Sequence, residues 1–302
     1  MVRLPGILLG IMVAGAAAWP GQAPAGPGAG ERCVVDDRDR QVCLSAPARR
    51  IISLSPGVTE LLFAAGAGDR IQGAVNFSDY PEAARDIPRV GSHTRVDLET
   101  VLAMDPDLVV AWASGNPEDQ VARLLDLGLT VYYSEPRRFD DVVSSVARLG
   151  RLTGTADAAA AANTRFLEAI AALEERYADA DPVRVFYQIW DDPVMTVNDT
   201  HLIAEAIALC GGRNVFGEVE RLVPRLDRES VLAAQPEAIV AGGMGEDDTS
   251  WLESWERFDE MPAVRRGNLF FVPPSTIQRP TPRVAEGSRL LCEHLETARE
   301  RR

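Results

Sequence analysis

The sequence predicts an α/β protein with two similar lobes, each built on a central, mainly parallel sheet, joined by one long α-helix. Three observations support this fold class. Short apolar runs alternate with helical patterns, a long helical pattern without Gly or Pro occupies the middle of the chain, and part of the first half recurs in the second. The expected divisions are a signal peptide over 1–25, an extension with a hairpin over 26–47, a first lobe over 48–154, a connecting helix over 155–180 and a second lobe over 181–302.

The amino terminus indicates export. A short basic region, Met1 to Arg3, precedes an apolar run from Leu8 to Ala18, which is about half the roughly 20 residues that a membrane span needs. Small residues suited to cleavage follow the run, and Cys33 lies too far on to indicate a lipid anchor. Residues 24–32 are rich in Pro, Gly and Ala and predict no regular structure.

Four cysteines in an exported chain predict disulfides. Cys33 and Cys43 are symmetric about a charged turn between two short strands, which places them opposite each other and pairs them. Cys210 and Cys292 then pair by elimination. Other pairings, and free buried thiols, are the alternatives.

The first lobe is expected to alternate strands and helices. Its elements are a strand over 50–55, a helix from Glu60 to Ala67 capped by Thr59, a strand over 107–112, a helix over 120–127 and a strand over 130–133. The unbroken apolar run over 107–112 is typical of a parallel strand buried on both faces.

The connecting helix is expected over 156–178, where Phe166, Leu167, Ile170 and Leu173 recur at helical spacing. About 23 residues would span about 35 Å. Pro182 ends the pattern, and strands and helices resume with a strand over 184–189 and continue to a helix around 289–296.

An internal repeat relates the two lobes. Shifted by 130 positions, residues 96–115 align without a gap with residues 226–245, and nine of the twenty positions are identical. The alternative, a shared helix–Pro–strand pattern, explains nine identities less well. Two like lobes on one helix leave a crevice at the carboxyl ends of their strands as the ligand site. The segments that follow those ends are 55–56, 76–80, 112–116, 188–190, 242–244 and 274–278.

Composition and motifs exclude several functions. With 45 acidic and 31 basic side chains, the net charge of −14 disfavours nucleic acid and anionic membranes as partners. The chain lacks a G-x-S-x-G motif, a Walker loop and an H-E-x-x-H motif, and its three His residues are scattered. We therefore expect no enzyme, no catalytic cofactor or residue, and no His-rich metal site.

Several motifs together resemble the periplasmic cobalamin-binding proteins of ABC importers, which belong to the helical-backbone metal receptor superfamily. These motifs are RIISLSP, SDYP, PDLVVAW followed by GN, LCGGRNVF and a closing TPR, and the resemblance covers roughly residues 48–297. It implies a class III periplasmic binding protein with two Rossmann-like lobes. It also implies a monomer in the periplasm that holds a cobalt corrinoid such as vitamin B12 and delivers it to a permease dimer with ATPase subunits. The resemblance further supports the Cys210–Cys292 disulfide.

The resemblance assigns aromatic pocket positions to Tyr80 and Trp112, whose rings suit a broad corrin disc with an apolar rim and amide arms. The alternative interpretation is that Tyr80 is an ordinary loop tyrosine and that Trp112 is a core residue at a strand end. His93 stands where the pattern often has tryptophan, and it could reach the open axial face of cobalt or serve only as a solvated loop residue. The remaining ligand candidates are Ser55, Pro56, Gln188, Ile189, Trp190, Met244 and Ser275.

Glu99 and Glu229 occupy equivalent positions in the two repeats. The matching acids of the family dock onto arginines of a two-fold permease dimer, where separated carboxylates set orientation and speed encounter. A first-turn acid that favours the helix dipole is the alternative, and both roles can hold at once. The rival cargo is haem or a ferric siderophore carried on the same fold, with Tyr80 or His93 as a ligand of haem iron.

Overall fold

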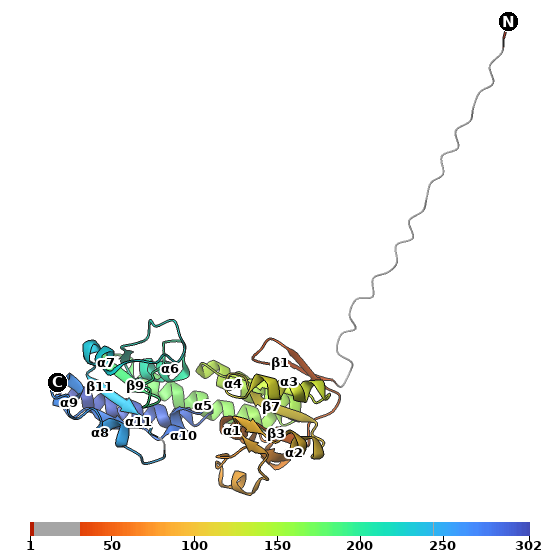
Figure 1. Ribbon diagram of the computed structural model, residues 1–302, viewed down its shortest axis with the longest axis horizontal. Coiled ribbons are helices and arrows are strands. Elements are labelled where there is room, and N and C mark those ends of the chain that lie inside the picture. Colours follow the sequence, from red (N-terminus) through yellow and green to blue (C-terminus); the bar gives the residue numbers. More distant parts are fainter. Residues whose placement is uncertain (3–30, 244) are drawn as a thin grey trace.

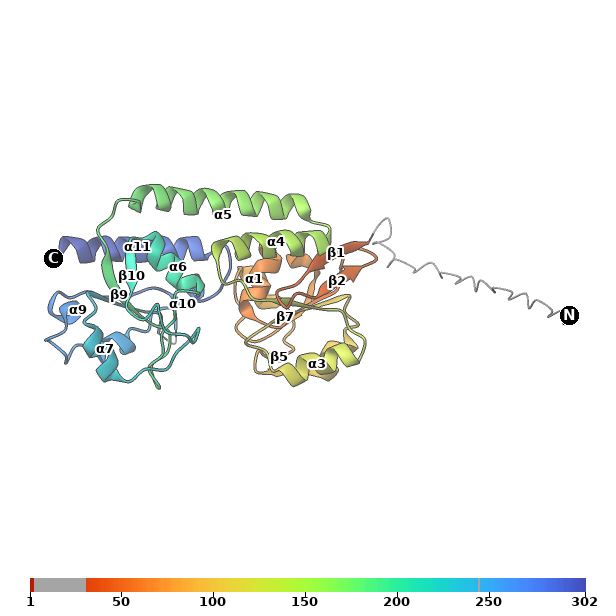
Figure 2. The same cartoon turned by 90° about the horizontal axis from the view of Figure 1, so that it is seen from above.

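The computed structural model describes residues 1–2 and 31–302 except 244. The expected signal peptide, most of the irregular stretch over 24–32 and the candidate Met244 therefore lie outside the described residues. Two four-stranded parallel sheets lie side by side along the long axis of the molecule, and α5 runs past both (Figures 1 and 2). The expected α/β fold class is confirmed. No helix in the described ranges combines the length and apolar character needed to cross a bilayer.

The amino-terminal extension forms the expected hairpin. Strands β1 (Arg32–Val35) and β2 (Gln41–Leu44) are antiparallel, and their register places Cys33 opposite Cys43. These two cysteines form a disulfide. The hairpin packs against α4 of the first lobe.

The first lobe carries a parallel sheet in the order β4-β3-β7-β8. Its elements are β3 (Ile51–Ser53), α1 (Pro56–Ala64), η1 (Gly68–Arg70), β4 (Ile71–Ala74), η2 (Glu82–Asp86), β5 (Gly91–Ser92), β6 (Arg95–Val96), α2 (Leu98–Ala103), β7 (Leu108–Trp112), α3 (Glu118–Asp126), β8 (Val131–Ser134) and α4 (Phe139–Thr153).

The start of α1 corrects one prediction. The helix begins at Pro56, and its cap is Ser55, whose hydroxyl accepts a hydrogen bond from the Val58 amide at 3.1 Å. Thr59 lies inside the helix, and its hydroxyl is 2.8 Å from that of Ser53. Ser55 caps the helix because proline fits its first turn and needs no amide partner there.

The connecting helix α5 (Ala156–Tyr177) follows the prediction closely. It packs along α4, a helix that our sequence analysis did not anticipate. Gly150 makes the close approach possible, because a Cβ there would stand 2.5 Å from the Cβ of Ala159. In Figure 2 the helix α5 forms the outermost layer, α4 and α11 lie beneath it, and the two sheets lie beyond these.

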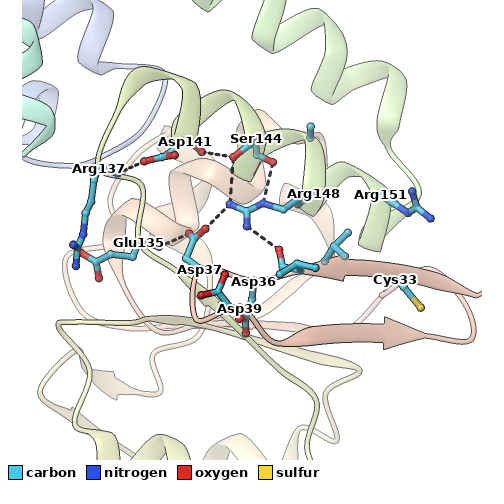
Figure 3. Close-up of a pocket in the computed structure, with 13 residues that line it drawn as sticks. Cys33, Asp36, Asp37, Asp39, Glu135, Arg137, Asp141, Ser144, Arg148 and Arg151 are labelled. Carbon is cyan, nitrogen blue, oxygen red and sulfur yellow. Dashed lines mark hydrogen bonds and ion pairs between the residues drawn. The ribbon is translucent and has the colours of Figure 1, made fainter. Parts of the chain in front are cut away.

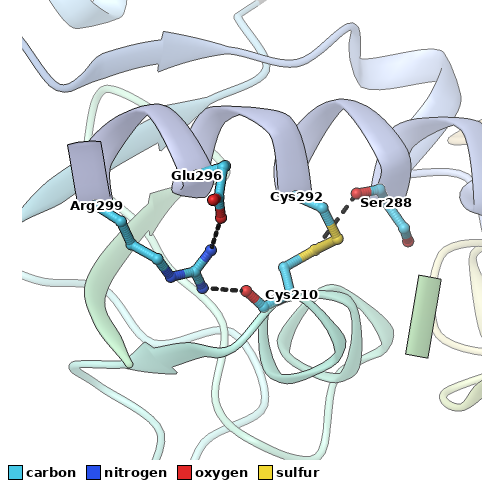
Figure 4. The surroundings of a disulfide bond; sticks show 5 residues. All are labelled: Cys210, Ser288, Cys292, Glu296 and Arg299. Atoms are coloured by element: carbon cyan, nitrogen blue, oxygen red, sulfur yellow. Dashed lines mark hydrogen bonds and ion pairs between the residues drawn. A yellow bond between two sulfur atoms is a disulfide. The ribbon is translucent and has the colours of Figure 1, made fainter. Parts of the chain in front are cut away.

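The second lobe repeats the first. Its sheet has the order β10-β9-β11-β12, which is the same topology with every strand parallel. Its elements are β9 (Val183–Gln188), α6 (Leu202–Leu209), β10 (Gly212–Asn214), α7 (Arg228–Ala234), β11 (Ala238–Ala241), α8 (Ser250–Glu253), α9 (Pro262–Arg265), β12 (Leu269–Phe271), α10 (Pro274–Ile277) and α11 (Val284–Glu300). A disulfide joins Cys210, at the end of α6, to Cys292 in α11 (Figure 4).

Candidate functional site

The carboxyl ends of parallel strands share one edge of a sheet, and the predicted ligand residues follow those ends in both lobes. The two edges meet through the segment 278–283, which links α10 to α11. Arg279 of that segment donates a hydrogen bond to Glu60 in α1 of the first lobe, with 2.8 Å between Nη1 and Oε1. Arg279 also donates to Asp79 in the loop after β4, at 2.9 Å. Helix α1, the loop after β4 and the segment after α10 therefore meet at one junction between the lobes.

Trp112 and His93 form the first wall of the candidate site. Trp112 ends β7 and is partly exposed, and its ring centroid lies 6.1 Å from that of His93. Asn116 ties the two together. Its Oδ1 accepts from the Trp112 amide at 2.7 Å, and its Nδ2 donates to the His93 carbonyl at 2.9 Å. Any side chain at Gly115 would overlap the Trp112 ring, so glycine is required there.

Tyr80 lies on the same edge, in the loop after β4, with 46% of its surface exposed. The guanidinium of Arg283 lies 3.9 Å from the centroid of its ring, a cation–π contact between the lobes. The neighbouring residues of the SDYP motif are also anchored. Ser78 accepts a hydrogen bond from Thr59, and Asp79 pairs with Arg279 at 2.9 Å.

Arg283 links Tyr80 to Ser275. Its Nη2 donates to the Ser275 hydroxyl at 3.2 Å, and that hydroxyl donates to the Glu246 carboxylate at 2.7 Å. Ser275 is buried beneath these partners. Sequence reasoning did not single out Arg283, although the closing TPR of the resemblance contains it.

Gln188 is the last residue of β9 in the second lobe, and Ile189 and Trp190 follow it, but the three side chains have different surroundings. Gln188 is fully buried. Its Oε1 accepts from the Trp255 indole at 2.7 Å, and its Nε2 donates to Asp191 at 2.9 Å. The oxygen and the nitrogen of the Gln188 side-chain amide thus both have hydrogen-bond partners within the protein. Ile189 is partly buried against the core.

Trp190 is 43% exposed and meets Trp251 edge to face, with ring centroids 6.0 Å apart. Trp251 was not among our candidates. Trp251 lies in α8, far along the chain from β9, and only its aromatic character indicates from the sequence that it belongs to the site. The edge of the second sheet thus presents an exposed tryptophan that is supported by a buried one.

Ser55 and Pro56 begin α1 at the carboxyl end of β3. The Ser55 hydroxyl serves the helix cap, while Pro56 is partly exposed. His201 caps α6 through its Nδ1, which accepts from the Ile203 amide at 3.1 Å. Burial and the nearby Arg137 lower the pKa of His201 to about 4, so the ring is neutral and able to accept that bond.

Glu60 is the most buried charge at the lobe junction. Its carboxylate accepts from Arg279 at 2.8 Å, from Arg283 at 3.3 Å and from the Thr281 hydroxyl at 3.0 Å. Burial raises the pKa of the Glu60 carboxyl, and the two guanidiniums oppose that rise. A cavity of about 510 Å³ adjoins this cluster on the α5 side, lined in part by Phe63, Pro81 and Phe166.

Glu99 and Glu229 occupy equivalent places in the two lobes. Each is exposed in the first turn of a short helix, α2 or α7. Each helix is capped by an aspartate two residues earlier, Asp97 or Asp227. The caps lower the pKa of both aspartates through hydrogen bonds from Thr100 and Ser230. Since the aspartates cap the helices, the two glutamates are not needed as caps.

Known proteins resemble this chain over most of its length. A family described as periplasmic binding protein matches residues 51–276. A vitamin B12-binding protein of Vibrio campbellii is 33% identical over 259 residues, which are 85% of this chain and 93% of the relative. A vitamin B12-binding protein of Vibrio cholerae serotype O1 is 32% identical over 254 residues, 84% of this chain and 91% of the relative.

Solved structures agree as well. The crystal structure of the periplasmic vitamin B12 binding protein BtuF of Vibrio cholerae matches with a TM-score of 0.78 at 32% identity, covering 84% of this chain and 99% of that one. The periplasmic heme-binding protein RhuT from Roseiflexus sp. RS-1 matches with a TM-score of 0.74 at 21% identity, covering 83% of this chain and 99% of that one. The second match shows a shared fold alone.

Proposed function

The chain belongs to the periplasmic binding protein family, and on that premise we propose that it captures a cobalt corrinoid in the periplasm and delivers it to an ABC importer. The observation that carries the proposal is the similarity, over more than four-fifths of the chain, to proteins named for vitamin B12 binding. The corrinoid would lie between the lobes, where loops from both sheets meet. The chain would act as a monomer, and its partner would be a permease dimer with ATPase subunits.

The aromatic side chains of the two edges support this choice of cargo. Tyr80 and Trp190 are each more than 40% exposed, and Trp112 is partly exposed. Rings of this kind bury about 150–250 Å² each against an apolar surface, while their OH and N–H groups serve polar neighbours. A corrin offers both kinds of surface.

We assign direct contacts to Tyr80, His93, Trp112, Ile189 and Trp190. Pro56 completes the rim, Ser275 would act indirectly through its bond to Arg283, and Ser55 acts through the helix start that it caps. Gln188 would act indirectly, by holding Trp255 and Asp191. Met244 lies outside the described residues, and its position in the sequence after β11 makes it a candidate contact.

Titration of the mature protein with cyanocobalamin, cobinamide, haem and a ferric siderophore tests the proposal. We expect the corrinoids to bind and to quench tryptophan fluorescence, with haem and siderophore much weaker. Haem binding without corrinoid binding would favour the rival cargo. Failure of all four at micromolar concentration would overturn the function.

Trp112→Ala is expected to weaken cyanocobalamin binding by more than about tenfold, or roughly 1.4 kcal/mol. The variant removes the ring that forms the first wall and leaves the apolar strand intact. Calorimetric titration measures the change. Leu127→Ala is the control, because Leu127 is an exposed apolar side chain of the same lobe but follows α3, away from the site. An unchanged Kd for Trp112→Ala would remove this residue from the pocket.

Glu99 and Glu229 are proposed to dock the carrier on its permease. Reversing both charges, with Glu99→Arg and Glu229→Arg, is expected to leave the Kd for cyanocobalamin unchanged and to slow uptake into cells or vesicles that contain the importer. A matched double reversal on α5, Glu168→Arg and Glu175→Arg, changes the net charge equally at exposed positions. Loss of binding without slower uptake per bound ligand would contradict the docking role.

A further inference from the structure

The disulfide-closed hairpin lies outside the part of the chain that the family model matches, which begins at residue 51. Its turn, residues 36–40, nevertheless reaches the edge of the first sheet. The Asp37 amide donates to the Tyr133 carbonyl in β8 at 3.1 Å. The hairpin therefore extends from α4, against which it packs, to the carboxyl edge of the sheet, where the candidate site lies.

Asp37 holds the loop after β8. Its Oδ2 accepts from the Glu135 amide at 2.6 Å, while its Oδ1 accepts from Arg148 of α4 at 2.6 Å (Figure 3). Glu135 in turn accepts from the amide of Ser114 at 2.7 Å and from its hydroxyl at 2.9 Å. A chain of bonds thus runs from the hairpin through Glu135 to the second residue after Trp112.

Arg38 reaches the same loop directly. Its guanidinium lies 4.2 Å from the centroid of the Tyr133 ring, and its Nη2 donates to the Ala113 carbonyl at 2.7 Å. Its Nη1 also pairs with Glu118 at 3.4 Å. Ala113 is the residue immediately after Trp112, so Arg38 bonds to the backbone next to the proposed ligand wall.

Together these bonds fix residues 113–116, the Trp112 loop, on two sides. Asn116 fixes it to the interior of the lobe, through Trp112, His93 and the Leu54 carbonyl. Asp37 and Arg38 fix it from the outside. We infer that the hairpin is a positioning element of the ligand site, in which Arg38 and Asp37 set the Trp112 loop without touching the ligand. This inference rests on the proposed corrinoid binding.

A purely structural role is the competing explanation. The hairpin covers β8, an edge strand, and edge strands benefit from a cover. Arg40 contributes to that cover, together with the Asp37 amide and the Asp36 carboxylate, which bond to the backbone of Tyr133. Arg40 donates to the Val131 carbonyl at 3.4 Å and lies 5.1 Å from the Tyr133 ring centroid. No bond from Arg40 to residues 113–116 is present in the described chain. Arg38 and Arg40 thus share a turn, a charge and an aromatic neighbour but differ in contact with the loop.

The test compares Arg38→Met with Arg40→Met in the full mature protein. Two quantities are measured: the Kd for cyanocobalamin, and amide hydrogen exchange over residues 113–116 without ligand. Arg38→Met is expected to raise the Kd by about fivefold or more, because an unfixed loop must be ordered on binding. It should also speed exchange at Ser114, Gly115 and Asn116. Arg38→Lys should recover part of both effects, and Arg40→Met should stay within about twofold of the wild type.

Equal effects of Arg38→Met and Arg40→Met would overturn the inference in favour of the structural role. So would unchanged exchange and affinity in Arg38→Met. If the wild type binds no corrinoid, the proposed function fails. The exchange measurement then decides separately whether the hairpin holds the Trp112 loop, and unchanged exchange would again reject it.

Discussion

Glu60→Ala is expected to lower the free energy of unfolding by about 3 kcal/mol. The Glu60 side chain is only 3% exposed, and the two arginines that it pairs with are 18% and 19% exposed. Removal of the carboxylate leaves two partly buried guanidiniums short of a partner, which costs more than the pair itself contributes. Arg279 keeps Asp79, and Arg283 keeps Ser275, so the loss stays near the lower end of the range for broken buried pairs. Urea denaturation measures the change.

Asp79→Asn is the matched control. Asp79 accepts from the same Nη1 of Arg279, at 2.9 Å against 2.8 Å for Glu60, but its side chain is 52% exposed. Solvent screens that pair, so we expect a loss below about 1 kcal/mol. If the two variants lose equal stability, burial is not what gives Glu60 its effect.

The Glu60 cluster also bears on how the lobes move. Glu60 belongs to α1 of the first lobe, while Arg279, Thr281 and Arg283 connect the helices of the second. The cluster therefore crosses the junction beside α5. Glu60→Ala leaves the Arg279–Asp79 ion pair and the Arg283–Tyr80 cation–π contact across this junction. Small-angle scattering of the variant is therefore expected to show only a slightly broader distribution of molecular dimensions than the wild type.

The duplicated fold was predictable because its evidence is local. Apolar runs such as 107–112 mark strands buried on both faces, and the 130-residue shift pairs the elements of the two lobes. The structure repeats this pairing in the identical strand order of both sheets. The connecting helix was equally clear, since nothing within 156–177 interrupts it.

The missed helix α4 also carried a local signal. Phe139, Val142, Val146, Leu149 and Leu152 are buried on one face at helical spacing. Gly150, a poor helix former, lies within this pattern, and our sequence analysis predicted no helix there. The cap of α1 was also misplaced. Ser55 and Thr59 are both good caps, and only the position of Pro56 distinguishes them.

The site was less predictable, because its contacts join distant parts of the chain. Position after a strand locates Gln188 at the edge of the sheet but does not give the direction of its side chain, which lies inside the lobe with Trp255. The cation–π pair of Tyr80 with Arg283 spans about 200 residues of sequence. Neither residue alone indicates it. Pairings of this kind depend on how the two lobes meet.

Replacing both Cys210 and Cys292 with alanine is expected to destabilise the second lobe by about 4.5 kcal/mol. The bond closes a loop with a sequence separation of 82, so its loss restores much entropy to the unfolded chain. Cys33 and Cys43 close a loop with a separation of only 10, and the same relation gives about 2.7 kcal/mol for Cys33→Ala with Cys43→Ala. Both pairs are disulfides, which makes the second double variant the control.

Other contacts hold α11 to the rest of the second lobe when the Cys210–Cys292 disulfide is removed. Arg299 donates to the Cys210 carbonyl at 2.5 Å (Figure 4). It also donates to the Asp181 carbonyl at 2.7 Å. We therefore expect the Cys210/Cys292 variant to fold and to unfold at a lower urea concentration. Trp251 and Trp255 lie in the apolar cluster of this lobe, so fluorescence follows its unfolding. A transition that coincides with that of the hairpin variant would show that loop length does not set the contribution of these bonds.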